Sequence, residues 1–174
     1  MRGDMALTAR LLLRASGLAG VVVALGGVLA VVAATRPWFT AVAEVAMLGV
    51  EQNRAVAALT GVPDTPGGWL TLAAGLVAVV LGAAAALDRP PASTRTVLLG
   101  CALLLVSAAG WAWVGPGPSL ARVAGGEGDQ LLDLAGRLPS GVDLQLSVRA
   151  AMGPVLSAVA AVMVAVGTLA ARDL

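Results

Sequence analysis

Four stretches of the chain are strongly apolar and contain no Asp, Glu, Arg, Lys or His. Each is about 20 residues long, which is the length an α-helix needs to cross roughly 30 Å of hydrocarbon. The pattern predicts a single membrane domain over residues 1–174, with a membrane all-α core that is a four-transmembrane-helix bundle. The four predicted spans are 15–34, 69–87, 96–114 and 150–171.

The segments between the spans alternate long, short and long. Residues 35–68 and 115–149 are long, whereas the connector 88–95 is short and contains Pro90-Pro91, which suits a tight, non-helical turn. Four spans place both ends of the chain on one side of the membrane. The first span could instead be a signal peptide, but its apolar core exceeds the length of about 7–15 residues that is usual for one.

The first long segment predicts a pair of β-strands. It starts with Arg36-Pro37-Trp38 and then alternates small, polar and β-branched residues, a pattern too polar to span a membrane. A helix over 41–59 is the alternative, because alanine is frequent there. The two predicted arms are about 38–47 and 54–60, with the turn near Gly49 or Gln52-Asn53.

The second long segment ends in a strictly alternating pattern. In "VDLQLSVR", residues 142–149, every second side chain is apolar, as in a half-buried strand. Before it, "GDQLLDLAGRL" places Leu131, Leu134 and Leu138 at helical spacing. We therefore expect a short amphipathic helix followed by a strand that runs directly into the fourth span. Together with the first pair, this strand would form a small extracytoplasmic β/α cap over the helices.

Composition supports a membrane protein and excludes several functions. The chain is 59% hydrophobic and only 12% charged, with a mean hydropathy of +0.92 and a net charge of +1. A soluble fold of this composition would expose large apolar patches, and a charge near zero gives no support for nucleic-acid binding. With no His and one Cys, no intrachain disulfide, Cys/His metal site or Cys/His nucleophile pair can form.

The distribution of arginine predicts the orientation. Cytoplasmic segments carry an excess of Arg and Lys close to the span ends. The N-terminal tail and the short connector have a higher density of arginine than the long segments, which also hold most of the carboxylates. We therefore expect a multi-pass protein of the plasma membrane with both termini in the cytoplasm. The arginines on the predicted inner side are Arg2, Arg10, Arg14, Arg89, Arg95 and Arg172.

Four tryptophans fall near one predicted boundary of the membrane, the outer one. Tryptophan is enriched at such boundaries because its ring is apolar and its N–H is polar. We interpret all four as interface anchors; a ligand cage, which would require the rings to converge, is the alternative. They are Trp38, Trp69, Trp111 and Trp113.

Small residues recur every four positions in two of the spans. Membrane helices associate through close packing of such residues, either within one chain or between copies. Intrachain packing is the interpretation we favour, and a homo-oligomer is the alternative. The predicted packing residues are Ala74, Ala78 and Gly82 in the second span, and Gly153, Ser157 and Ala161 in the fourth.

Carboxylates outside the spans are the remaining candidate chemistry. Two carboxylates could serve acid–base catalysis, and an acidic stretch could bind a cation. Neither group has a further partner at a recognisable spacing, so we interpret both as solvated surface and predict no catalytic residue, no metal site and no cofactor. The groups are Glu44, Glu51 and Asp64, and Glu127, Asp129 and Asp133.

Two short motifs and the four-span layout resemble a known family. The motifs are Arg36-Pro37-Trp38 at the end of the first span and Leu59-Thr60-Gly61 before the second. With four spans, they resemble the tryptophan-biosynthesis-associated membrane protein family of actinobacteria. That family has no established activity, so the resemblance implies a membrane protein without assigning catalytic residues. The layout is also similar to the claudin-type four-helix plan.

These observations favour a non-enzymatic function. Pumps and coupled transporters usually place ionisable groups at membrane depth, and the four spans contain no acidic or basic side chain. We expect an accessory or scaffold protein whose outward cap contacts a membrane-protein partner. The alternative is a membrane component that binds or passes a small apolar or aromatic metabolite.

Overall fold

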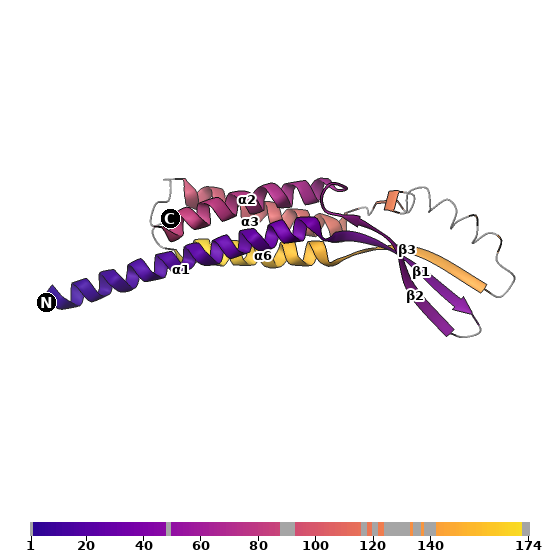
Figure 1. Cartoon of the computed structure of the whole chain (residues 1–174), viewed down its shortest axis with the longest axis horizontal. Helices are drawn as coiled ribbons and strands as arrows, with labels where there is room; N and C mark the ends of the chain where they lie inside the picture. The colour runs from indigo at the N-terminus through magenta and orange to yellow at the C-terminus, as the bar shows by residue number, and fades with distance from the viewer. Residues whose placement is uncertain are drawn as a thin grey trace.

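Four long helices lie side by side, and a small three-stranded sheet extends from one end of them (Figure 1). The structure is a computed structural model that describes residues 2–47, 50–87, 93–115, 118–119, 122–123, 133, 137 and 142–171. We call the end of the bundle that carries the sheet the strand end. The first helix projects past the other helices at the opposite end (Figure 1).

The four long apolar helices predicted from the sequence are present. Each contains a stretch long and apolar enough to cross a membrane by length and composition, which indicates a multi-pass membrane protein; in α1 this stretch is Gly17–Thr35. Helix α2 begins at Pro66 rather than Trp69, because the Thr65 hydroxyl accepts the N–H of Gly68 and proline suits the first turn. The helices are α1 (Arg2–Thr35), α2 (Pro66–Ala86), α3 (Thr94–Val114) and α6 (Met152–Ala170).

The helices form a closed bundle with a small polar contact inside it. Helix α1 packs against α2 and α6, and α3 packs against the same two helices from the other side. Large apolar side chains such as Leu98, Leu105 and Val164 are fully buried in the core. Within this core, the Ser157 hydroxyl donates to the carbonyl of Leu105 at 3.2 Å and lies 3.4 Å from the Thr71 hydroxyl. One hydroxyl thereby links three helices where unsatisfied polar groups would be costly.

Glycines bring the backbones of α1 and α2 into close contact. A Cβ atom at Gly82 would lie 2.5 Å from the backbone nitrogen of Ala24, and one at Gly27 would lie 2.6 Å from that of Val79. A Cβ at Gly20 would lie 2.5 Å from the nitrogen of Ala86. These glycines permit a helix separation that any larger side chain would prevent. The contact lies within one chain.

The sheet is antiparallel, with the strand order β2-β1-β3. Its strands are β1 (Pro37–Met47), β2 (Val50–Thr60) and β3 (Val142–Ala150). The structure therefore has strands where the sequence left a choice between strands and a helix over 41–59. The second arm begins earlier than the predicted residue 54, and Gln52-Asn53 lies within β2, so the alternative turn at that position is wrong.

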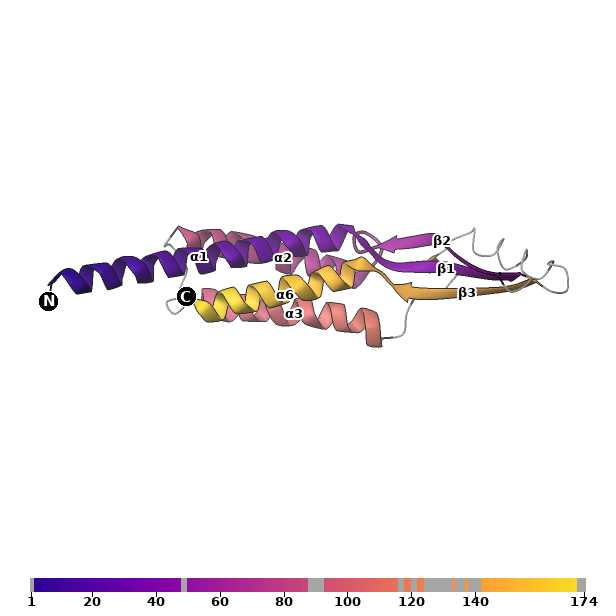
Figure 2. The same ribbon diagram turned by 90° about the horizontal axis from the view of Figure 1, so that it is seen from below.

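Two of the strands continue directly into helices. Only Arg36 separates α1 from β1, and only Ala151 separates β3 from α6. The N–H of Ala151 donates to the carbonyl of Trp38 at 2.9 Å, which ties the two junctions together. The strands consequently run on in the direction of the helices, away from the bundle (Figure 2).

The two faces of the sheet differ in polarity. In the register, Ala41 lies opposite Val148 and Ala43 opposite Leu146, so these residues share one face; the two alanines are buried. Thr40 lies opposite Arg149 on the other face, where Arg149 forms an ion pair with Glu44. Among the described side chains of 142–149, Val148 thus shares the face of the buried Ala41, and Arg149 lies on the other face.

Several sequence predictions lie outside the described residues. They include the turn at Gly49, the connector with Pro90-Pro91, and the leucines of the predicted amphipathic helix, Leu131, Leu134 and Leu138. From that region the structure describes Asp133, which is helical, and its ion pair with Arg137 at 2.9 Å.

Candidate functional sites at the strand end

Trp38 is buried at the junction of the bundle and the sheet, with none of its surface exposed. Its indole N–H donates to the carbonyl of Ala33 in α1 at 3.0 Å. The prediction that Trp38 anchors the protein at a membrane boundary is therefore wrong, because a ring without exposed surface contacts only protein. Trp38 instead closes the core beneath the sheet, together with Phe39, Ala108 and Ala112.

Three glycines from separate elements surround the Trp38 ring. A Cβ atom at Gly61 would lie 2.5 Å from Nε1 of Trp38, and one at Gly153 would lie 2.6 Å from the same atom. A Cβ atom at Gly67 would lie 2.6 Å from Cζ3 of Trp38. Gly61 is the last residue of Leu59-Thr60-Gly61, and its N–H donates to the carbonyl of Arg36 at 3.0 Å. The two motifs that carry the family resemblance therefore meet in space.

The other three tryptophans are about half exposed, unlike Trp38. The Trp69 indole N–H donates to the carbonyl of Pro63 at 3.3 Å. The Trp111 ring contacts Phe39 of β1 edge to face, with centroids 6.4 Å apart and an interplanar angle of 87°. The four tryptophans do not form a closed ligand cage, because the Trp38 ring is fully buried in the core and the other three rings are about half exposed. Their role as interface anchors stays a prediction.

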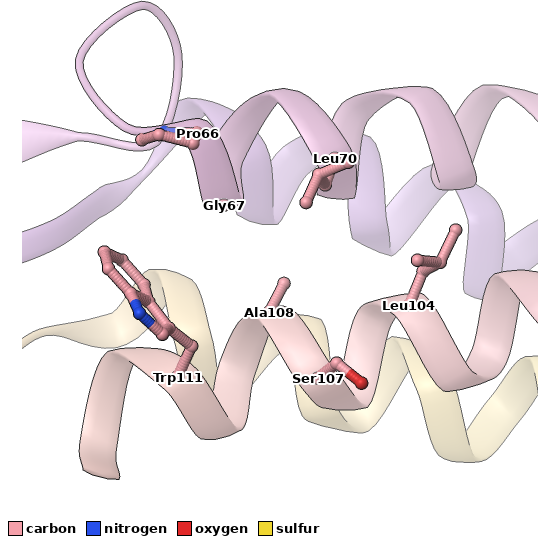
Figure 3. A pocket seen from close by; sticks show the side chains of 7 residues that line it. All are labelled: Pro66, Gly67, Leu70, Leu104, Ser107, Ala108 and Trp111. Atoms are coloured by element: carbon pink, nitrogen blue, oxygen red, sulfur yellow. The ribbon is translucent and has the colours of Figure 1, made fainter. Parts of the chain in front are cut away.

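A cleft opens between α2 and α3 close to Trp111. It has a volume of about 270 Å³ and an almost wholly apolar lining. Figure 3 shows side chains from both helices directed into the space between them, with the Trp111 ring on the sheet side. Its lining suits a small apolar or aromatic molecule or a segment of a lipid chain. The lining residues are Pro66, Gly67, Leu70, Leu104, Ser107, Ala108 and Trp111.

The predicted packing residues are all buried within the chain. Ala74, Ala78 and Ala161 belong to the main core cluster, and Gly82 lies against α1. Ser157 makes the polar contact in the core, and Gly153 lies against Trp38. Packing within the chain accounts for these residues without a second copy.

The carboxylate side chains that the structure describes, those of Glu44, Asp64 and Asp133, are engaged locally. Glu44 pairs with Arg149, and the Asp64 carboxylate accepts the N–H and hydroxyl of Thr60 at 2.9 and 2.7 Å. Among the residues whose placement is described, no group of three or more His, Cys, Asp or Glu could hold a metal ion. Glu127 and Asp129 lie outside those residues, and the side chain of Glu51 is not described.

The sequence reasoning missed both the cleft and the position of Trp38. The cleft depends on Leu70 and Leu104, which look like any other leucine in a span. The position of Trp38 had a weak signal, because Gly67 and Gly153 lie within three residues of predicted span boundaries, but their approach to one ring requires the fold. Comparison with known proteins adds no assignment: no protein-family model, curated protein or solved structure matches this chain.

Proposed function

We propose that this chain is a non-enzymatic accessory or scaffold protein of the plasma membrane whose sheet contacts a partner protein. The observation that carries the proposal is the position of the sheet. Its strands extend past the ends of the apolar helices (Figure 2), where they would lie outside the hydrocarbon. The resemblance to the tryptophan-biosynthesis-associated membrane family is part of the same proposal. That family has no established activity, so membership would be compatible with a non-enzymatic function.

Exposed apolar side chains support placement of the helices in a membrane. The bundle is covered with exposed leucine and valine, a surface that soluble monomers avoid. They occur on all four helices rather than on one patch, as expected if lipid surrounds the bundle. Examples are Leu25, Val80, Leu103 and Val162, which are 55%, 66%, 68% and 59% exposed.

The edges of the sheet support contact with a partner. In the described part of the chain, β2 and β3 are edge strands, and an edge strand offers unpaired N–H and C=O groups to an added strand. Arg54, Ala55 and Ala58 of β2 are exposed, so a partner strand would meet two small side chains and the charge of Arg54. Such an edge permits the backbone of a partner strand to approach the backbone of β2 closely.

The orientation belongs to the same proposal. Arginine is denser in the N-terminal tail and the short connector, which supports a cytoplasmic location for the end opposite the sheet. Arg95 is exposed at the start of α3 on that side. The sheet would then face the outside of the cell.

One labelling experiment tests orientation and partner separately. Single cysteines are introduced by Ala58→Cys in β2 and, as the matched control, Ser93→Cys beside α3; both positions are exposed. The buried native Cys101 is replaced by alanine. In intact cells, a membrane-impermeant maleimide should label the cysteine at 58, and should label the one at 93 only after permeabilisation. A photo-crosslinker attached at position 58 should then yield one defined adduct that position 93 does not give.

The outcomes separate the two claims. Labelling at position 93 but not at 58 in intact cells would reverse the orientation. Labelling at position 58 without any adduct after crosslinking would contradict the proposal that the sheet contacts a partner protein. An adduct with twice the mass of this chain would identify the partner as a second copy.

A second candidate function is favoured by the cleft between α2 and α3 (Figure 3). We propose as the alternative that this cleft binds a small apolar or aromatic metabolite. Its volume of about 270 Å³ is close to the lower end of the range of ligand pockets. The adjacent Trp111 ring, held edge to face by Phe39, offers one aromatic wall at a fixed position.

Thermal shift in mild detergent tests this alternative. Indole or tryptophan at about 100 times its dissociation constant should stabilise the protein by about 2.7 kcal/mol. Leu104→Trp, which fills the cleft, should abolish the shift. Leu103→Trp is the matched control, because Leu103 is 68% exposed and does not line the cleft. No shift with the unmodified protein, or an equal shift in both variants, would rule out the cleft as the site.

A further inference from the structure

A second and larger groove lies between α1 and α6 at the strand end. It has a volume of about 530 Å³, and most of its lining is apolar. Leu29 and Val32 of α1 and Arg36, the residue that follows the helix, all line it, so the groove runs along the end of α1 towards β1. Its lining comprises Leu29, Val32, Arg36, Pro37, Thr40, Ala151, Met152 and Leu156.

The rim of this groove carries an unneutralised positive charge. Arg36 is exposed, and none of the described carboxylates forms an ion pair with it. The nearby carboxylate side chains that the structure describes are engaged elsewhere: Glu44 pairs with Arg149, and Asp64 accepts two hydrogen bonds from Thr60. Thr40 is a further lining residue of the groove. A guanidinium recognises a phosphate or a carboxylate through paired N–H···O bonds, so an anionic group of this kind suits the rim.

The start of α6 adds to the positive potential at the rim. The N-cap residue Ala151 makes no side-chain cap, and the first turn of α6 holds no acidic residue. Ala151 and Met152 both line the groove. The positive end of a helix dipole therefore meets the same space as Arg36, and both favour an anion.

We propose that this groove binds one anionic phospholipid, with its phosphate on Arg36 and an acyl chain along Leu29, Val32 and Leu156. A free phosphate would use only the rim and leave the apolar length of the groove empty. The inference rests on membrane insertion of the bundle and is independent of the partner that we propose for the sheet.

Lipid binding to the purified full chain tests the inference. The chain in mild detergent is titrated with dioleoylphosphatidylglycerol or dioleoylphosphatidylcholine, and bound lipid is counted by native mass spectrometry. Phosphatidylglycerol should bind more tightly, and Arg36→Gln should weaken its binding at least tenfold, the effect of losing one charge-assisted contact. Arg95→Gln is the matched control, because Arg95 is also exposed but lies at the other end of the bundle. It should leave binding unchanged.

A second variant tests the apolar part of the groove. Val32→Trp places a large ring in the groove, whereas Val80→Trp places the same ring on an exposed position of α2 that lines neither space. Val32→Trp alone should weaken phosphatidylglycerol binding at least tenfold. If Arg36→Gln fails to fold, the comparison of Val32→Trp with Val80→Trp still tests whether the lipid binds in the groove. Equal binding of the two lipids, no difference between the paired variants, or displacement of the lipid by equimolar inorganic phosphate would overturn the inference.

Discussion

Gly82→Leu is expected to destabilise the bundle by about 1–3 kcal/mol or more, the usual cost of forcing atoms into a packed core. A Cβ at this position would lie 2.5 Å from the backbone nitrogen of Ala24 and 2.9 Å from the carbonyl oxygen of Gly20. These are backbone atoms, so no side chain can rotate away and α1 must separate from α2. The measurement is the thermal unfolding midpoint in mild detergent.

Val80→Leu is the matched control for this prediction. Val80 is on the same helix and is 66% exposed, so a larger side chain there meets no protein and should leave the midpoint nearly unchanged. Ala161→Leu, at a fully buried position of α6, should behave like Gly82→Leu. Equal tolerance at all three positions would show that the close approach of these helices does not hold the bundle together.

Trp38→Ala is expected to cost about 3–5 kcal/mol, as for other buried large aromatic residues. The substitution leaves a cavity where β1, α2 and α6 meet, and it removes the N–H that pairs with the buried carbonyl of Ala33. Trp113→Ala is the control, because the Trp113 side chain is 58% exposed and should cost much less. Thermal unfolding of both variants in the same detergent provides the comparison.

The glycines around the ring give a complementary test of the same site. Gly67→Ala adds one methyl group that would lie 2.6 Å from the Trp38 ring, so it should destabilise although alanine favours a helix. Gly110→Ala, in the interior of α3 with nothing within 4 Å of its Cβ position, should stabilise by about 0.5–1 kcal/mol. A stabilising Gly67→Ala would contradict the packing of Trp38.

Periodicity was a good guide to the elements of this fold. The four helices follow from uninterrupted apolar stretches, and the strand β3 follows from the alternation in 142–149. The choice between strand and helix for 38–60 could not be made from that segment alone. Its pairing with β3 settles it, and β3 lies about 100 residues later in the chain.

The site residues were harder to predict, because their roles depend on residues that are distant in the sequence and meet only in the fold. The preference of tryptophan for membrane boundaries describes rings that reach the surface, and nothing local to Trp38 reports that Gly61 and Gly153 cover its ring. The four-residue rows identified Gly82 but not Gly27 or Gly75. Gly27 lies seven residues after Gly20 in α1, and Gly75 lies seven residues before Gly82 in α2, so each pair shares a helix face. The sequence prediction considered only a spacing of four residues.

The register of the sheet also sets an order of events on the ribosome. Strand β1 can pair with β2 as soon as Thr60 has emerged, because the two strands are adjacent in the chain. Its other edge is completed by β3, in which Leu146 lies opposite Ala43 about 100 residues later. At a synthesis rate of about 5–20 residues per second, the nascent chain keeps that edge of β1 unpaired for about 5–20 s. During this interval β1 is open to pairing with a neighbouring nascent chain, and the arrival of β3, immediately before the last helix, ends it.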